Sequence, residues 1–205
     1  MSIVRDTTRA IRITLVLWVL TAIIYPLVII VVGQVLFPFQ ANGSIVENPQ
    51  GQAVGSALIG QSFTTERYFQ SRPSTTNYSS FTAKERDPEN VGQTTGVSGA
   101  SNLAPSNPDL LKRINETVSQ LQQAIIKPTA DLVYTSGSSL DPHITVEGAQ
   151  AQLNRVASAR GLSADQINPL IAKHTDGRFL GIFGEPGVNV LNLNLDLDIL
   201  QPPRQ

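Results

Sequence analysis

The longest apolar stretch of the chain runs from Ile13 to Leu36, and no charged residue occurs between Arg12 and Glu47. A helix needs about 20 apolar residues to cross about 30 Å of hydrocarbon. A single strand in lipid would leave its backbone groups unpaired, so the segment must cross as a helix. The pattern therefore predicts a transmembrane helix over residues 13–36. A buried core helix is the alternative, but such helices rarely lack a polar face over this length.

The charges on either side of this helix predict its orientation. No basic residue follows it before Arg67, whereas the short segment before it is rich in arginine (Arg5, Arg9 and Arg12 against Asp6). Positive charge favours the cytoplasmic side. We therefore expect a cytoplasmic tail over residues 1–12 and an extracytoplasmic domain over residues 37–205.

A cleavable signal peptide is the rival interpretation of the same segment. Signal peptides have a shorter apolar region, about 7–15 residues, followed by a site of small residues. The apolar run here is longer, and Phe37–Gly43 contains no obvious cleavage site. We expect a retained single-pass anchor.

Four residues of the predicted helix suggest contact with other helices. Pro26 removes a backbone donor at mid-span and predicts a kink, and small side chains permit close approach of a second helix. The candidate packing residues are Thr21, Ala22, Pro26 and Gly33.

Helical periodicity and capping residues mark three helices in the remainder of the chain. Asn107 and Pro108 are suited to begin a helix that ends at Pro128, with its apolar stripe formed by Leu111, Ile114, Val118, Leu121 and Ile125. Thr145 caps a second helix that ends at Gly161. Ser163 and Gln166 form a capping box that opens a third.

Strand-like patterns lie between and after these helices. Ala53–Gly60 and Asp131–Thr135 are short apolar runs, and Val188–Asp198 alternates apolar and polar residues with one slip at Val190 and Leu191. Alternation with period two predicts a half-buried strand, with a bulge at the slip. The predicted fold is thus one N-terminal transmembrane helix plus one mixed α+β extracytoplasmic domain.

Composition narrows the chemistry. The 205 residues carry a net charge of −1 and no cysteine, with His143 and His174 as the only histidines. A near-neutral chain lacks the basic footprint of a nucleic-acid-binding protein, so the aromatic residues between Phe63 and Phe81 are expected to pack in a core. Disulfides, thiolate metal sites and histidine-rich metal centres are excluded, and no metal site is expected.

Two groups of residues are weak candidates for chemistry. Ser138, Asp141 and His143 are residue types of a hydrolytic triad, but triads are defined by geometry and no G-x-S-x-G turn accompanies them. A hydrogen-bonded loop is the simpler interpretation. Asp196 and Asp198 fall on one face of the predicted final strand, where they are weak candidates for attracting cations.

An ordered set of short segments resembles one family over nearly the whole chain. The chain is similar to the C subunit of the Kdp-type potassium-transporting P-type ATPase in Phe37–Ser44, Gly55–Gln61, Tyr68–Ser74, Ser101–Pro108, Ser136–Ile144, Arg155–Gly161 and Val188–Leu191. The resemblance implies a bacterial inner-membrane complex. Its expected partners are a potassium-channel-like subunit, a P-type ATPase catalytic subunit and a further small single-helix subunit.

The resemblance also implies a role without independent catalysis. The sequence contains neither the Asp-Lys-Thr-Gly of an aspartyl-phosphate site nor a Walker motif, so this chain alone should not hydrolyse ATP. The family C subunit is regarded as stabilising or assembling the pump, and as a catalytic chaperone that raises the affinity of the catalytic subunit for ATP. If ATP is contacted, the candidates are Ser136, Gly137, Ser138 and Gln152.

The nucleotide role conflicts with the predicted orientation, because ATP is cytoplasmic. Four functions therefore stay open at this point. The chain is a non-catalytic pump subunit, a cap that shapes ion access at the potassium entrance, a membrane-anchored extracytoplasmic hydrolase, or a solitary anchored binding protein.

Overall fold

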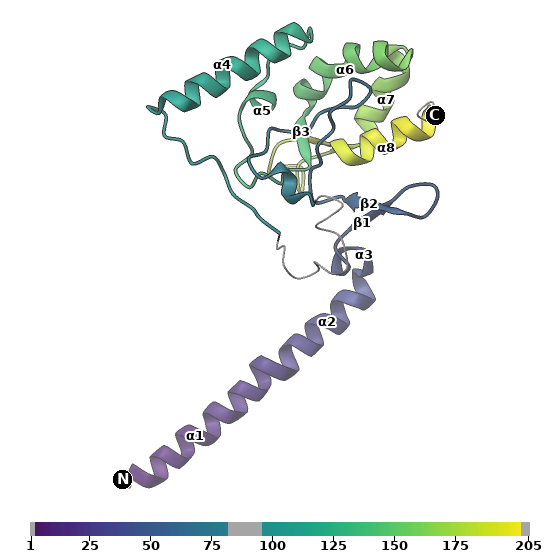
Figure 1. The fold of residues 1–205 in the computed structure, drawn as a ribbon. Coiled ribbons are helices and arrows are strands. Elements are labelled where there is room, and N and C mark those ends of the chain that lie inside the picture. Colours follow the sequence, from purple (N-terminus) through teal and green to yellow (C-terminus); the bar gives the residue numbers. More distant parts are fainter. Residues whose placement is uncertain (1–2, 82–95, 202–205) are drawn as a thin grey trace. The chain divides into compact units, whose positions relative to one another are not determined.

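The computed structural model describes residues 3–81 and 96–201. The chain divides into two compact units, one up to Ile45 and one from Val46 onward, which are described separately below. Figure 1 shows the elements of both units.

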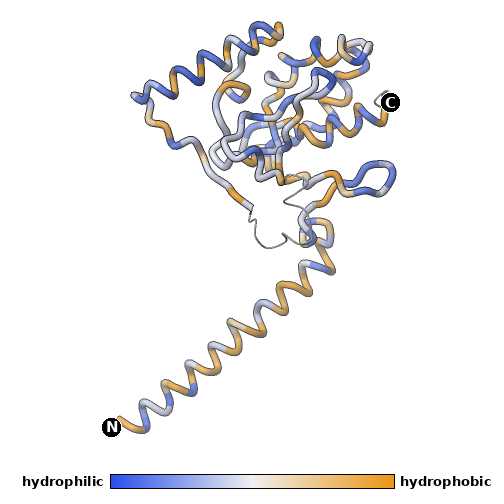
Figure 2. The backbone as a smooth tube through the Cα atoms, viewed as in Figure 1, coloured by the Kyte–Doolittle hydropathy of each residue, from blue (hydrophilic) through white to orange (hydrophobic). Residues whose placement is uncertain are grey.

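The first unit is a nearly continuous helix followed by a short helical turn. It comprises α1 (Ile3–Val19), the π-helical turn η1 (Leu20–Ile24), α2 (Tyr25–Leu36) and α3 (Pro38–Ala41). Ile3–Leu36 is the one helix among the described residues that is long and apolar enough to cross a membrane. Its apolar run is evident in Figure 2. The helix ends where the sequence predicts, but it begins earlier and includes most of the basic tail.

A π turn lies immediately before Pro26, the residue at which a kink is predicted. The backbone N–H of Tyr25 donates to the carbonyl of Leu20, one residue further back than in an α-helix. Pro26 follows immediately and has no N–H to donate, so the regular ladder is already interrupted at this point. Thr21 and Ala22 lie within the turn, and Gly33 lies in α2. Packing of these residues against partner helices stays a prediction.

The second unit combines two small sheets with five α-helices and one 3-10 turn among its described residues. The strands are β1 (Ile45–Glu47), β2 (Ala53–Ser56), β3 (His143–Thr145), β4 (Thr175–Asp176) and β5 (Gly187–Asn189). The helices are the 3-10 turn η2 (Asn77–Ser79), α4 (Pro108–Gln123), α5 (Ala130–Val133), α6 (Val146–Arg160), α7 (Ala164–Lys173) and α8 (Val190–Leu200). β1 pairs with β2, and the second sheet has the order β3-β5-β4 with both pairs antiparallel. The mixed α+β class is as predicted.

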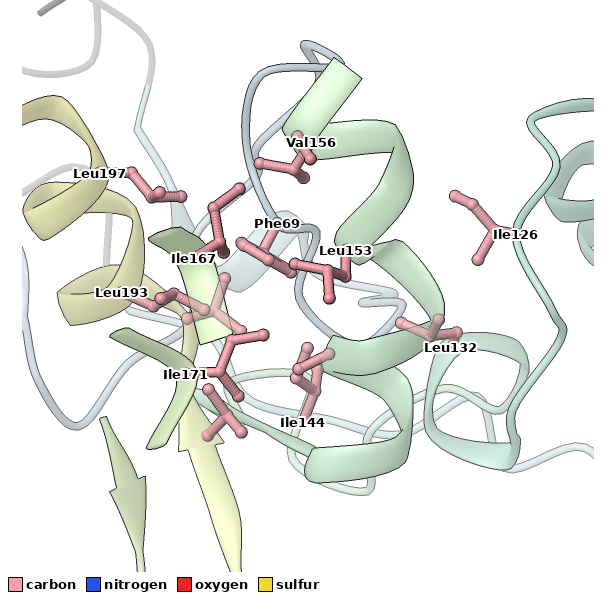
Figure 3. Close-up of a cluster of buried hydrophobic side chains, with 14 of the residues drawn as sticks. Phe69, Ile126, Leu132, Ile144, Leu153, Val156, Ile167, Ile171, Leu193 and Leu197 are labelled. Carbon is pink, nitrogen blue, oxygen red and sulfur yellow. The ribbon is translucent and has the colours of Figure 1, made fainter. Parts of the chain in front are cut away.

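The hydrophobic core lies where α6, α7 and α8 meet a long loop. Phe69, in that loop, is completely buried, and Figure 3 shows its ring between Leu153 of α6 and Ile167 of α7. Leu193 and Leu197 of α8 close the core from another side. Phe63 is partly buried against this core, so two aromatic residues of the stretch from Phe63 to Phe81 pack as expected.

The predicted helix boundaries are confirmed where capping residues define them. The side chain of Asn107 accepts from the N–H of Asp109, and the hydroxyl of Thr145 accepts from the N–H of Gly148. Gly161 ends α6 in the left-handed conformation, and Ser163 opens α7 with a complete capping box. The first helix ends at Gln123, before the predicted stop at Pro128, and Leu111 and Ile125 of its predicted stripe are exposed.

Two predicted strands are wrong. Val188–Asp198 forms the short strand β5 and then the helix α8, because Asn189 caps that helix by accepting from the N–H of Asn192. The slip at Val190 and Leu191 is therefore the start of a helix. Asp131–Thr135 is not a strand either, since Ala130–Val133 forms the single helical turn α5. Of Ala53–Gly60, only Ala53–Ser56 is a strand.

Candidate functional site

Two of the four predicted nucleotide-contact residues, Gln152 and Ser136, are hydrogen-bonded to one segment, Phe69–Thr75. Gln152 approaches from α6. Its side-chain oxygen accepts from the N–H of Gln70 at 2.8 Å, and its side-chain nitrogen donates to the carbonyl of the same residue at 3.1 Å. Gln152 is completely buried. The segment is thus fixed to α6 as if to a neighbouring strand.

The amide of Gln152 has its remaining hydrogen-bonding capacity used as well. Its oxygen also accepts from a guanidinium nitrogen of Arg155 at 2.9 Å, and its nitrogen lies 3.4 Å from the carbonyl of Gly148. A side-chain amide offers two donor hydrogens and two acceptor positions. Contact between Gln152 and a nucleotide would therefore require these internal bonds to break.

Arg155 extends the same clamp toward the start of the loop. Its guanidinium donates to the carbonyls of Glu66 at 2.7 Å and Tyr68 at 2.9 Å. Burial lowers the pKa of Arg155, and the carboxylate of Glu66 opposes that effect. An arginine with its high intrinsic pKa stays charged under these conditions, so the clamp is a charge-assisted one.

The segment is also held by the loop Ser136–Asp141. The N–H of Ser136 donates to the carbonyl of Pro73 at 3.0 Å, and Arg72 forms an ion pair with Asp141 at 2.8 Å. Ser138 donates to the second oxygen of Asp141 at 3.1 Å. Ser136 is completely buried, whereas Gly137 is exposed and Ser138 is half-buried. Of the four candidates, only Gly137 and Ser138 offer surface to a ligand.

The possible hydrolytic residues do not form a triad. Ser138 has Asp141 as its partner, whereas Nε2 of His143 lies 2.8 Å from the carboxylate of Asp176 on β4. Nucleophilic catalysis by serine requires a base within hydrogen-bonding reach of the hydroxyl. The structure gives the serine a carboxylate and pairs the imidazole elsewhere. The loop interpretation therefore describes Ser138, Asp141 and His143 better.

A cleft of about 480 Å³ lies beside the clamped segment. Its lining includes Glu66, Gln70, Leu121 and Arg155, so it combines polar groups of the clamp with the apolar face of α4. Within the described part of the chain, no group of three histidine, aspartate or glutamate side chains is placed to hold a metal ion.

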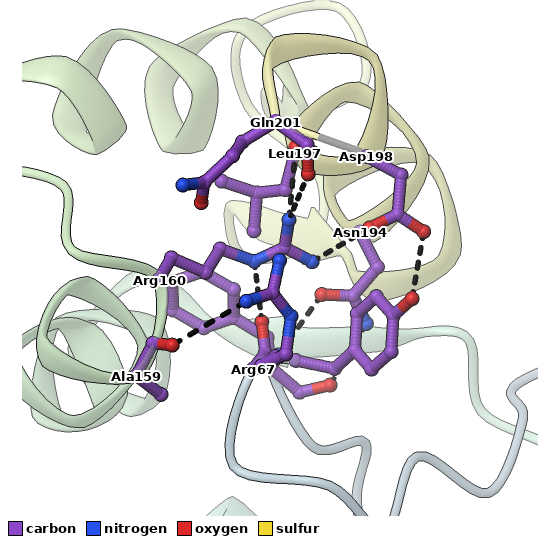
Figure 4. A network of polar contacts seen from close by, with 9 residues as sticks. Arg67, Ala159, Arg160, Asn194, Leu197, Asp198 and Gln201 are labelled. Carbon is purple, nitrogen blue, oxygen red and sulfur yellow. Dashed lines mark hydrogen bonds and ion pairs between the residues drawn. The ribbon is translucent and has the colours of Figure 1, made fainter. Parts of the chain in front are cut away.

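Asp196 and Asp198 bind α8 to the rest of the unit instead of facing outward from a strand. Asp198 accepts from Arg160 at 2.8 Å and from the phenol of Tyr68 at 2.7 Å, as Figure 4 shows. Burial alone would raise the pKa of Asp196, but hydrogen bonds and charge from Lys173 and His174 outweigh it and hold that pKa below its usual value. The suggested attraction of cations depended on a strand that carries both carboxylates, whereas Asp196 and Asp198 lie in the helix α8.

Arg160 is the most enclosed charged residue of this network. Its side chain is completely buried and donates to the carbonyls of Arg67 at 2.6 Å and Leu197 at 2.9 Å. It also lies 5.0 Å from the centre of the Tyr68 ring. Sequence reasoning missed Arg155 and Arg160 as organising residues. The sequence feature that could have indicated them is the position of both arginines on a helix next to the core residues Val156 and Ala157.

Comparison with known proteins gives one family. The family described as KdpC: K+-transporting ATPase, c chain, matches residues 7–199. The "Potassium-transporting ATPase KdpC subunit 1" of Nostoc sp. is 61% identical over 203 residues, which cover 98% of this chain and 100% of that protein. The KdpC subunit of Microcystis aeruginosa is 59% identical over the whole of both chains. That of Synechocystis sp. is 57% identical over 95% of this chain and 98% of its own.

Proposed function

The chain belongs to the KdpC family, the c chain of K+-transporting ATPases, and from this membership we propose that it is the non-catalytic, membrane-anchored subunit of an ATP-driven potassium uptake pump. The observation that carries the proposal is the match over residues 7–199, which includes both the anchor helix and the folded unit. The 205 residues contain no aspartyl-phosphate motif. Phosphoryl transfer therefore belongs to another subunit.

In this proposal, residues 13–36 span the bacterial inner membrane, with the tail cytoplasmic and residues 37–205 extracytoplasmic. The arginines before the span and the absence of basic residues from 13 to 66 support that orientation. The partners are a potassium-channel-like subunit and the P-type catalytic subunit, together with a small single-helix subunit. A topology reporter fused to the C-terminus tests the orientation, and a cytoplasmic signal would refute it.

The proposed role is to stabilise or assemble the complex. The hydrogen bonds around Phe69–Thr75 support this role, because the polar groups of Gln152 and Arg155 bind the backbone of the folded unit and few of them are available to bind or convert a substrate. The test is to express the other subunits with and without this chain and to measure their copurification and their potassium-dependent ATPase activity. We expect both to fall when the chain is omitted. Unchanged assembly and activity would contradict the proposal.

A direct contact with ATP is a separate prediction, because it requires the folded unit to face the cytoplasm. The half-buried hydroxyl of Ser138 is the best probe, because replacing completely buried Gln152 would damage the fold as well. If ATP is contacted, Ser138→Ala in the complex raises the ATP concentration needed for half-maximal activity, whereas Ser119→Ala on the exposed face of α4 leaves it unchanged. Equal values for both variants would remove the contact from the proposal.

A further inference from the structure

An exposed apolar tip lies between β4 and β5. Its four large side chains are Phe179, Leu180, Ile182 and Phe183, with exposed fractions of 70%, 73%, 72% and 61%. Isolated exposed apolar residues are common, but four in five consecutive positions form a patch of the kind that marks an interaction site. We call Phe179–Phe183 the apolar tip.

The backbone of the apolar tip is held in one shape. Phe179 and Phe183 exchange two backbone hydrogen bonds, of 2.8 and 2.9 Å, and Gly181 donates to the carbonyl of Arg178 at 2.9 Å. At the base, one guanidinium nitrogen of Arg178 reaches both carboxylate oxygens of Glu185, at 3.1 and 2.9 Å. A preformed loop loses less conformational entropy when it binds.

The backbone of Leu180 adopts a left-handed conformation that is strained for a leucine. Its φ is +53°, a region that glycine or asparagine occupies more readily than a branched apolar residue. A turn that only had to reverse the chain would be better served by glycine there. Strain of this sort at an exposed position is typical of functional loops.

From this geometry we propose that the apolar tip docks into an apolar pocket on the extramembrane surface of another subunit of the same membrane complex. The proposal rests on the assembly role given above. Four side chains supply roughly 500–600 Å² even when fully buried, less than the about 800 Å² per partner of a stable interface. The tip is therefore too small to hold a partner from solution by itself. It suffices for a partner that shares the membrane, because the anchor helix already supplies a high effective concentration.

The chemistry of the tip also favours a protein pocket over lipid. Segments that rest in a membrane interface typically have lysine or arginine beside their apolar side chains. The large side chains of the apolar tip are only phenylalanine, leucine and isoleucine, and the flanking residues Asp176, Arg178 and Glu185 sum to a negative charge. Anionic lipid headgroups would repel that charge, whereas aromatic and aliphatic anchors are typical of the buried centre of a protein interface.

The test is hydroxyl-radical footprinting of the full chain, first alone in detergent, then alone in lipid nanodiscs, and then in the assembled complex. We expect oxidation of Phe179 and Phe183 to fall by about tenfold only in the complex, as an anchor becomes buried. Exposed Leu111 on α4 serves as an internal reference. Equal oxidation of the tip in all three samples would overturn the proposal. Lower oxidation of the tip in nanodiscs that contain no partner subunit would overturn the proposal and indicate contact with lipid. Oxidation that falls as the concentration of the isolated chain rises would overturn it and indicate self-association.

A pair of matched variants gives a second readout. Leu180→Ser with Ile182→Ser removes two exposed aliphatic side chains from the tip, and Leu111→Ser with Ile125→Ser removes two from elsewhere. We expect the tip variant to dissociate from the complex about tenfold faster, with the control unchanged and circular dichroism alike for both. Equal retention of both variants would refute the docking site alone. Failure of the wild-type chain to copurify at all would instead refute the proposed function.

Discussion

Replacing Arg160 by methionine should cost more stability than any surface change of the same kind. Methionine keeps most of the apolar stem of the side chain but removes the guanidinium, which is completely buried. Three backbone carbonyls then lose a donor, those of Arg67, Leu197 and Gln201. The carboxylate of Asp198, which is 28% exposed, also loses its cation.

The magnitude follows from those losses. A buried acceptor left without a donor costs about 1–3 kcal/mol, and breaking a buried ion pair by removing one partner costs about 3–5 kcal/mol. The losses overlap, since methionine lets the site relax and water reach Asp198. We expect the free energy of unfolding to fall by about 3–5 kcal/mol. Arg160→Lys should cost less, about 1–3 kcal/mol, because the ammonium keeps the charge but not the forked geometry.

The assay is urea unfolding of the full chain in mild detergent, followed by circular dichroism. The matched control is Arg178→Met, because Arg178 also pairs with a carboxylate but is 46% exposed with a partner that is 80% exposed. An exposed pair contributes about 0–1 kcal/mol. If Arg160→Met costs no more than Arg178→Met, the reasoning that Arg160 fixes α8 to the loop is wrong.

Three further predictions concern other buried polar groups. Burial raises the pKa of Tyr78, whose phenol donates to the carbonyl of Arg72, to about 12. The stability that its protonated phenol contributes is therefore complete below about pH 10 and is lost as pH rises toward 12, and ultraviolet titration of phenolate should lose its latest step in Tyr78→Phe. The pKa of Asp196 is depressed, so the stability that its carboxylate contributes is present above about pH 4 and is lost as pH falls below that value. The difference in unfolding free energy between wild type and Asp196→Asn, measured by urea unfolding, should shrink below about pH 4, and a constant difference would contradict the depressed pKa. Asp131 accepts from both the N–H and the hydroxyl of Thr145, and a Cβ on Gly148 would lie 2.5 Å from its carboxylate. Asp131→Ala and Gly148→Ala should therefore each lower the thermal midpoint by an amount equivalent to about 2–4 kcal/mol, whereas the control Gly137→Ala, which has open space around it, should leave the midpoint unchanged.

Sequence reasoning succeeded where a local rule decides the structure. The apolar run to Leu36, the caps at Asn107 and Thr145 and the capping box at Ser163 each depend on residues within one or two turns. The backbone at these positions has few alternatives, because an uncapped helix end or a charged group in lipid is costly.

Sequence reasoning failed where a distant partner decides. Asn194 is the clearest case, because it is a polar residue at a position of α8 that faces the core. It is accommodated there by accepting from the N–H of Phe69 and donating to its carbonyl, both at 2.9 Å. Without knowledge of that loop, an asparagine between leucines completes an alternating pattern and indicates a strand. The same holds for Gln152, whose partner Gln70 lies 82 positions away in the chain.

The π turn at Leu20–Ile24 has a consequence for how the anchor can be recognised. One residue advances an α-helix by about 100°, so a turn that accommodates an extra residue rotates everything before it relative to everything after it. Side chains of α1 and α2 that a straight helix would align in one stripe are therefore offset around the axis. A partner helix that packs against both α1 and α2 has to wrap around the anchor; otherwise two separate helices are needed. Deleting a single residue from the turn would realign the stripes, and would do so without altering the hydrophobicity that keeps the chain in the bilayer.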